Sequence, residues 1–365
     1  MTGPRLELRS APHLHAAQGV EQIMRNVVLA LLPLCAFGVF LFGLSAAALI
    51  VVVTLSCLGT EQLFNRLAGR AGTLGDYSAA ITGMLLALTL PPAFPLWMGA
   101  VSGFVAIGLG KALFGGLGFN VFNPALVGRA FAQAAFPAAI TDWSPVMRAG
   151  RFLELQSSSL SLPFMAPPES AVIDAVTGAT PLATYKTGVA TTSNFDLLFG
   201  FTPGAVGETS ALLIMICGVY LLARRMLDWR IPVAILLSAA LLSGALNLLD
   251  PARYPGALYM LFSGGLMLGA WFMATDMVGT PVTPLGVWVY GVLIGVTTIV
   301  IRLFGALPEG VMYAILLGNA ATPLIESVTQ PRAYGRHRGR GQPGKRGPPL
   351  APATHRSPRR YRRCA

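Results

Sequence analysis

The chain alternates long apolar runs with short polar connections along most of its length. An α-helix needs about 17 to 25 apolar residues to cross a bilayer without tilting. Eight runs meet this requirement and are predicted to span a membrane: 26–43, 45–63, 96–114, 209–226, 231–248, 256–274, 285–304 and 308–326. Because the first run is followed by many others, we interpret it as a span and not as a cleaved signal peptide.

Two further apolar runs are short and interrupted. Residues 77–90 end at a pair of prolines, and residues 121–137 contain an Asn-Pro pair followed by Arg129 and Gln133. Proline removes a backbone donor and ends or kinks a helix. With these two segments, the sequence predicts an all-α polytopic membrane protein of ten transmembrane helices.

Lys and Arg in the short connections predict the orientation of these spans, because basic residues concentrate in cytoplasmic loops. A cytoplasmic N-terminus places nearly all basic connections on the cytoplasmic side, and ten spans return the C-terminus to that side. The basic residues on the cytoplasmic side are Arg5, Arg9, Arg25, Arg66, Arg70, Lys111, Arg224, Arg225, Arg230 and those of the C-terminal tail, whereas the short outer loops contain only Arg253.

One connection, residues 138–208, is long, acidic and on the outer side in this topology. It separates two halves of five spans, and an odd number of spans per half gives the halves opposite orientations. Each half contains a Gly-rich helix stopped by proline and then an Asn/Pro-interrupted segment, 118–131 and 318–324. The alternative is that Gly, Ala and Pro are simply common in packed membrane helices. The predicted parts are a cytoplasmic segment 1–25, a five-helix repeat 26–137, the loop 138–208, a second repeat 209–330 and a basic, disordered cytoplasmic tail 331–365.

Composition agrees with the membrane assignment and locates the charge. The 365 residues are 54% hydrophobic and 11% charged, with a mean hydropathy of +0.64, whereas soluble domains are about 25% charged. The whole net charge of +11 lies in the tail 331–365, which has eleven Lys and Arg and no acid. Such a tail could bind nucleic acid, but its position after the last span favours cytoplasmic retention and contact with anionic lipids. Beyond residue 341 it reads as disordered, either a lineage-specific extension or a frameshifted end.

The cysteines and histidines exclude several redox cofactors. Cys35, Cys57, Cys217 and Cys364 are scattered without the CxxC spacing of an iron–sulfur or zinc site. All four histidines lie in polar ends of the chain, so no apolar segment offers a haem ligand. No metal site is predicted.

The most specific motif is DAVTGATPL, residues 174–182, in the long outer loop. With this motif the chain resembles the RnfD/NqrB family of integral subunits of ion-translocating oxidoreductases. The resemblance implies FMN joined through a phosphoester bond to Thr180, attached by a flavin transferase that recognises Asp174. Thr177, Gly178 and Ala179 complete the attachment motif, and the small residues allow the backbone to approach the phosphate. Phosphoryl transfer requires an exposed hydroxyl at Thr180; the alternative is an ordinary glycine turn.

Three further stretches, 81–92, 118–131 and 274–286, are similar to the family's sequences, so the resemblance covers roughly residues 20–335. It implies ten helices in two inverted five-helix repeats, similar to urea and ammonium channels, and a second, non-covalent flavin, riboflavin, among the helices. The short N-terminal segment resembles RnfD more than NqrB. Beyond about Gly341 the chain departs from the family pattern.

Several ionisable residues lie within or near the predicted spans, and intramembrane charge commonly marks function. Glu61, Asp76, Lys111, Arg302 and Glu326 are near predicted helix ends, where side chains can extend towards water. Arg129 and Asp276 lie beside helix-breaking motifs and are candidates for the vicinity of an ion or flavin, although a structural salt bridge or cap is the favoured interpretation. Asn120 and Asn123 could hydrogen-bond a flavin or satisfy broken backbone.

The leading hypothesis is a flavoprotein subunit of an Rnf-type ferredoxin:NAD⁺ oxidoreductase in the bacterial inner membrane. It would relay electrons through FMN phosphoryl threonine while the complex moves Na⁺ or H⁺. Without cluster motifs or a dinucleotide-binding motif, the chain depends on partners: cluster-binding, NADH-binding and FMN-bearing subunits, and a flavin transferase for maturation. The alternatives are an NqrB-type subunit of a Na⁺-pumping NADH:quinone oxidoreductase and, from another class, a passive channel for small solutes.

Overall fold

The structure of the chain is a computed structural model that describes residues 19–69, 72–163, 180–187, 192–208, 210–251, 253–305 and 309–331. The residues divide into two units, 1–329 and 330–365, and every helix described below lies in the first unit. The predicted tail and four of the motif residues (Asp174, Thr177, Gly178 and Ala179) lie outside the described residues.

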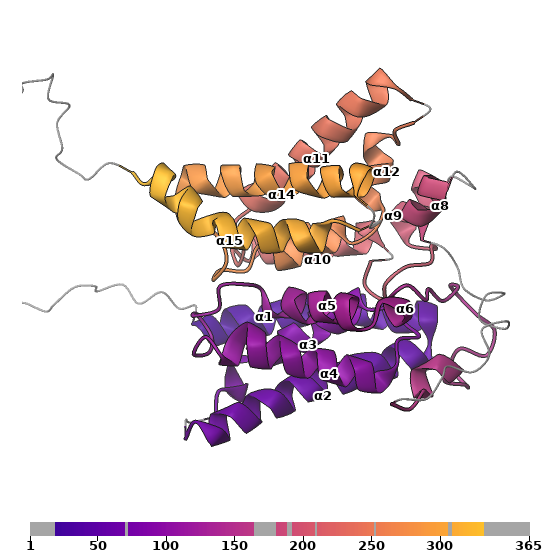
Figure 1. Cartoon of the computed structure of the whole chain (residues 1–365), viewed down its shortest axis with the longest axis vertical. Coiled ribbons are helices and arrows are strands. Elements are labelled where there is room, and N and C mark those ends of the chain that lie inside the picture. Colours follow the sequence, from indigo (N-terminus) through magenta and orange to yellow (C-terminus); the bar gives the residue numbers. More distant parts are fainter. Residues whose placement is uncertain are drawn as a thin grey trace, which may run out of the picture. The chain divides into compact units, whose positions relative to one another are not determined.

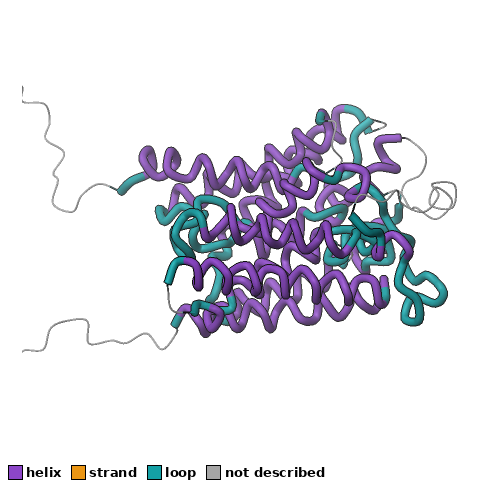
Figure 2. Tube along the Cα trace, turned by 60° about the horizontal axis from the view of Figure 1, so that its bottom comes forward, coloured by secondary structure: helices purple, strands orange, loops and turns teal. Residues whose placement is uncertain are grey.

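The described residues form helices and no strands (Figure 2). The first half contains α1 (Val20–Phe42), α2 (Leu44–Leu67), η1 (Leu74–Asp76), α3 (Ser78–Thr89), α4 (Leu96–Ile107) with the π-helical turn η2 (Gly108–Ala112), and α5 (Pro124–Ala135). The connection contains α6 (Pro137–Ile140), η3 (Ser157–Leu160), α8 (Pro181–Thr187) and α9 (Asn194–Phe199). The second half contains α10 (Ala211–Ala223), α11 (Arg230–Leu249), α12 (Ala257–Phe262), α13 (Leu266–Leu268) with the π-helical turn η4 (Gly269–Met273), α14 (Pro284–Phe304) and α15 (Val311–Thr329).

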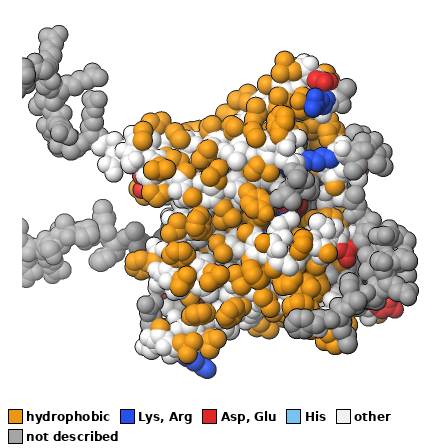
Figure 3. Space-filling model, viewed as in Figure 1, with side chains coloured by type: hydrophobic (Ala, Val, Ile, Leu, Met, Phe, Trp, Pro, Cys, Tyr) orange, Lys and Arg blue, Asp and Glu red, His pale blue; other side chains and the backbone are white. Residues whose placement is uncertain are grey.

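Five of these helices, α1, α2, α11, α14 and α15, are long and apolar enough to cross a membrane. The apolar helices α3, α4 with η2, and α10 are shorter. Apolar side chains such as Leu55 and Leu241 are exposed on the helix surfaces. On the face shown in Figure 3, hydrophobic side chains cover the helices and the few charged ones lie towards the edges. Such a surface is compatible with lipid and marks a polytopic membrane protein.

Two predicted segments differ from expectation. Residues 256–274, predicted as one span, are broken at Ser263-Gly264-Gly265, where Gly264 has a φ of +61° that L-residues with side chains rarely adopt. Residues 318–324, predicted as an interrupted segment, lie inside the continuous α15, which accommodates Pro323. The helix break of the second half therefore precedes the position that the Asn/Pro pattern indicated.

The two halves show the same order of helix packing. In the first half α2 packs against α3 and α4, and α4 against α5; in the second α11 packs against α12 and α14, and α14 against α15. Contacts of α1 with α10 and of α5 with α15 join the halves, which Figure 1 shows as two groups of helices.

Glycines allow α11 and α14 to approach closely. A β-carbon at Gly295 would lie 2.0 Å from the Ser238 Oγ, and one at Gly291 would lie 2.5 Å from the Ala234 Cβ. Small residues at helix contacts are the usual means of close packing in membranes, where lipid removes most of the hydrophobic driving force between helices. This tight helix pair supports the broken helix beside it.

Candidate functional site

Thr180, the predicted flavin acceptor, lies at the start of α8. Its Oγ1 accepts a hydrogen bond from the Ala183 amide at 3.3 Å, and its carbonyl accepts one from the Thr184 amide. The residue is 5% exposed. The sequence predicted an exposed hydroxyl, and that expectation is wrong for this conformation, because the side chain turns inward to cap α8.

The side chain of Thr180 lines a small cavity with Leu182, Thr202, Phe262, Glu208 and Glu309. The cavity has a volume of ≈ 10 Å³, about enough for one water molecule. An isoalloxazine ring is therefore too large for it. The cavity does, however, place the Thr180 hydroxyl beside two carboxyl groups, those of Glu208 at the end of the long loop and Glu309 in the second half of the chain.

A buried arginine joins these carboxyl groups to the first half. Arg129, on α5, donates hydrogen bonds to the Thr89 carbonyl at the end of α3 and to Glu309, and lies 3.6 Å from the Glu208 Oε1. A cation at the C-terminal end of a helix interacts favourably with the helix dipole and with carbonyls that lack partners. Arg129 thus forms both a helix cap and ion pairs, the structural interpretation favoured from the sequence.

A second arginine caps the broken helix of the other half. Arg302, on α14, donates to the Met260 carbonyl at 2.6 Å and to the Ser263 carbonyl at 3.0 Å, at the end of α12. Across the break, a β-carbon at Gly265 would lie 2.4 Å from the Glu208 Oε1, so any larger residue there would displace the Glu208 carboxyl group. The expectation that Arg302 extends towards water is wrong, since the residue is 1% exposed.

Glu208 is buried within this group of charges. Burial and the neighbouring Glu309 carboxylate raise the pKa of Glu208 well above its usual range, against the opposing effects of Arg129 and Arg302. We call Arg129, Arg302, Glu208 and Glu309 the outer charge cluster. Glu208 belongs to the acidic loop 138–208, but neither Glu208 nor Glu309 is among the candidate residues that the sequence indicates. Each lies two or three residues before a helix, Glu208 before α10 and Glu309 before α15, and that position was the available signal.

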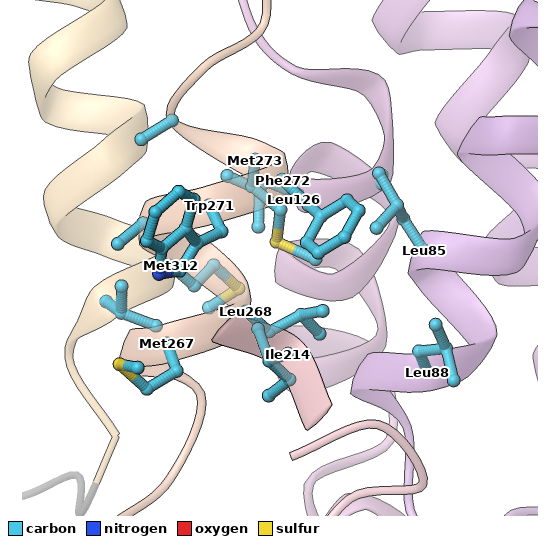
Figure 4. Packing of buried hydrophobic residues seen from close by; sticks show 14 of the residues in the cluster. Leu85, Leu88, Leu126, Ile214, Met267, Leu268, Trp271, Phe272, Met273 and Met312 are labelled. Carbon is cyan, nitrogen blue, oxygen red and sulfur yellow. The ribbon is translucent and has the colours of Figure 1, made fainter. Parts of the chain in front are cut away.

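The other candidate residues surround a second, larger cavity of ≈ 100 Å³. Asn120, Asn123 and Asp276 line it, together with Lys111, whereas Arg129 does not. The candidates therefore divide between two sites. Trp271 and Phe272 contribute aromatic rings to the same cavity, and Figure 4 shows them among the apolar side chains of the core.

Two asparagines hold the backbone at this cavity. Asn123 caps α5 by accepting from the Ala125 amide at 3.0 Å, and donates to the Met273 carbonyl at 3.2 Å, linking α5 to the end of η4. Asn120 donates to the Phe122 carbonyl, but its Oδ1 is buried and has no hydrogen-bond partner among the described residues. A buried acceptor of this kind is costly unless a ligand or water satisfies it.

Charged residues also face the larger cavity. Lys111, on η2, contacts the Glu61 Oε1 at 2.7 Å and the Ser78 Oγ at 2.5 Å. Both members of this ion pair are buried, so the expectation that they extend towards water is wrong. Asp276 accepts from the Val278 amide at 3.4 Å, and its partial burial raises its pKa.

Fold and site together define a polytopic membrane protein with buried charges at two broken helices. Comparison with known proteins then identifies its family. The model of the NQR2, RnfD, RnfE family matches residues 7–335, and the chain belongs to this family.

Curated relatives align over nearly their whole length. The D subunit of an ion-translocating oxidoreductase complex of Halorhodospira halophila is 39% identical over 91% of this chain and 96% of the relative. The D subunit of a Na⁺-translocating ferredoxin:NAD⁺ oxidoreductase complex of Acetobacterium woodii is 40% identical over 90% and 95%. A proton-translocating counterpart of Clostridium ljungdahlii is 36% identical over 91% and 96%. The named relatives therefore differ in their coupling ion.

Proposed function

We propose that this chain is the flavin-carrying membrane subunit of an Rnf-type ferredoxin:NAD⁺ oxidoreductase. The observation that carries the proposal is the near full-length similarity to proteins named as the D subunit of such complexes. Family membership favours this role over a passive solute channel. The proposed partners are the cluster-binding, NADH-binding and FMN-bearing subunits of the complex, and a flavin transferase for maturation.

In the proposed arrangement, ten spans form two inverted repeats in the inner membrane of a bacterium. Both termini are cytoplasmic and the 138–208 loop is periplasmic. The shared packing order of the halves and the matching positions of α3 and α12 support the repeat. Short or broken helices near the midplane are characteristic of inverted repeats, because they place helix ends at a functional site.

Thr180 is the proposed attachment point of FMN, with Asp174, Thr177, Gly178 and Ala179 as the motif read by the transferase. Bound FMN would supply one- and two-electron exchange. Since the Thr180 hydroxyl is buried against α8, we infer that attachment precedes packing of α8 or occurs when α8 moves outward. The ring would lie outside the small cavity, which is too small to hold it.

The larger cavity is the proposed site of riboflavin. Asn120 offers a buried unpaired acceptor, and Trp271 and Phe272 offer aromatic faces. Flavin rings present donors and acceptors along one edge and a planar face, so these groups fit such a ligand. Asn123 and Asp276 hold the surrounding backbone in place.

The decisive experiment is ultraviolet in-gel fluorescence after denaturing electrophoresis of the chain made with its flavin transferase. We expect a fluorescent band in wild type and its complete loss in Thr180→Ala. Thr184→Ala is the matched control, because Thr184 lies one helical turn further along α8, outside the motif. A fluorescent band in Thr180→Ala would overturn the assignment, and copurification with quinone-reductase subunits would favour the NqrB role.

A further inference from the structure

A third cavity lies at the turn between the first two helices, and it shares no lining residue with the two cavities described above. Its volume is ≈ 180 Å³, which leaves room for several water molecules or for a small polar group. Charged and hydroxyl-bearing side chains surround it, namely those of Ser45, Arg148, Arg151 and Glu154. The cavity therefore suits a polar, charged occupant.

The helix turn beside this cavity lies at a membrane surface. Both α1 and α2 are long and apolar enough to cross a membrane, and only Gly43 separates them. The turn between two consecutive spans lies where the hydrocarbon core ends and the lipid headgroups begin. Phe42, at the end of α1, and Ser45, in the first turn of α2, both line the cavity. The cavity is thus at the depth of the lipid headgroups.

Part of the long connection is fixed against this helix turn. The Leu44 amide donates to the Arg151 carbonyl at 2.8 Å, and the Gln156 amide donates to the Ser45 Oγ at 2.9 Å. A β-carbon at Gly43 would lie 2.0 Å from the Arg151 carbonyl oxygen, so a side chain there would push the connection away. These contacts hold the residues that form the wall of the cavity in place.

Two arginines of this segment have donors that are not used within the described residues. Neither Arg148 nor Arg151 forms an ion pair with a described acidic residue. The Arg151 Nε donates to the Phe40 carbonyl at 3.0 Å, while its Nη groups form no hydrogen bond with a described residue. The same guanidinium lies 4.8 Å from the Phe152 ring centroid and 5.6 Å from that of Phe40. A planar guanidinium with free donors is well suited to bind phosphate.

Exposed apolar side chains lie next to these arginines. Phe40 and Phe152 are exposed, and Leu153, which follows Phe152, is 86% exposed. An arginine among exposed aromatic and leucine side chains is typical of the membrane interface, where apolar groups face the hydrocarbon and the charged group faces the headgroups. This neighbourhood favours a lipid over a water-soluble occupant.

We propose that this cavity binds the headgroup of phosphatidylethanolamine, with the phosphodiester at Arg148 and Arg151 and the ammonium group at Glu154. Two arginines and a carboxylate are complementary to a headgroup that carries both signs of charge, since each charge then has an opposite partner. The ammonium of ethanolamine has three N–H donors for a carboxylate, whereas choline has none. The hydroxyl of Ser45 accepts from the Gln156 amide and has a proton left to donate to a phosphate oxygen. The proposal does not depend on the flavin role.

The test is native mass spectrometry of the full chain in detergent, freed of copurified lipid and then titrated with one lipid at a time. We expect wild type to bind one phosphatidylethanolamine with a Kd about tenfold below that for phosphatidylcholine, and to bind phosphatidylglycerol less tightly than phosphatidylethanolamine. Arg148→Gln and Arg151→Gln should each raise the Kd for phosphatidylethanolamine about tenfold. Glu154→Gln should raise it to the value for phosphatidylcholine and leave the latter unchanged. Arg253→Gln is the matched control, because Arg253 also contacts an aromatic ring between two helices but does not line the cavity.

The opposite results would overturn the proposal. If both arginine variants bind phosphatidylethanolamine as tightly as Arg253→Gln does, the cavity is not the lipid site. Tighter binding of phosphatidylglycerol than of phosphatidylethanolamine by wild type would refute the role of Glu154. Displacement of the lipid by inorganic phosphate at millimolar concentration would show a site for a free anion instead. Should Arg151→Gln fail to fold, Arg148→Gln decides the outcome, because Arg148 is exposed and its side chain forms no hydrogen bond with a described residue.

Discussion

Arg302→Met tests whether the arginine caps hold the broken helix in place. The guanidinium donates to two carbonyls at the end of α12, at 2.6 and 3.0 Å, from a fully buried position. Hydrogen bonds to charged groups contribute about 1.5–3 kcal/mol each. Methionine nearly preserves the volume but leaves both carbonyls and the neighbouring carboxyl groups without this partner. We therefore expect a loss of about 3–5 kcal/mol in the free energy of unfolding.

The assay is thermal unfolding of the full chain in nanodiscs, followed by tryptophan fluorescence. A loss of this size corresponds to a Tm lower by on the order of 5–15 °C. Arg253→Met is the matched control, because Arg253 is exposed and its guanidinium lies 5.7 Å from the Tyr254 ring centroid; we expect a change below about 0.5 kcal/mol. A Tm of Arg302→Met equal to that of the control would refute the capping argument.

Two more predictions concern the larger cavity. Lys111→Met alone should lower the free energy of unfolding by about 3–5 kcal/mol, because it leaves the Glu61 carboxylate buried without its cation. The double variant Glu61→Gln/Lys111→Met should recover most of that loss. Chemical denaturation measures both, and a larger loss in the double variant than in Lys111→Met would contradict the prediction. The pKa of Asp276 is raised in the folded chain. Between the pKa of the unfolded chain and that of the folded chain, only the folded chain holds the proton, so the free energy of unfolding falls as the pH rises through this range. Asp276→Asn should remove the part of the pH dependence that begins at the unfolded pKa of an aspartate and extends above it. Identical pH profiles of unfolding for the variant and wild type would exclude the effect.

The apolar pattern predicted the positions of most helices, because each apolar run is long and bounded by polar or proline residues. It could not predict the break at Ser263-Gly264-Gly265, since glycine is also common in continuous membrane helices. The Asn/Pro pattern predicted an interruption around Pro323, but α15 is continuous there. A packed helix tolerates proline when its neighbours compensate for the lost hydrogen bond.

The candidate residues could be recognised individually from the sequence, but not their grouping. Asn120, Asn123 and Asp276 surround one cavity, while Arg129 belongs to the other site. The assignment of Arg129 depends on Glu309, a partner 180 residues away. Local sequence contains no signal for such a pairing, which results from how the two halves pack.

The separation of Arg129 from its partners also constrains how the protein is made. Arg129 enters the membrane with the first half, yet Glu208 and Glu309 are synthesised later, and Glu309 only just before the last helix. The nascent first half must therefore keep a cation at the end of α3 solvated, or held by the insertion machinery, until translation is nearly complete. Chains that terminate before residue 309 should be substrates for membrane quality control, because they retain a buried arginine without Glu309.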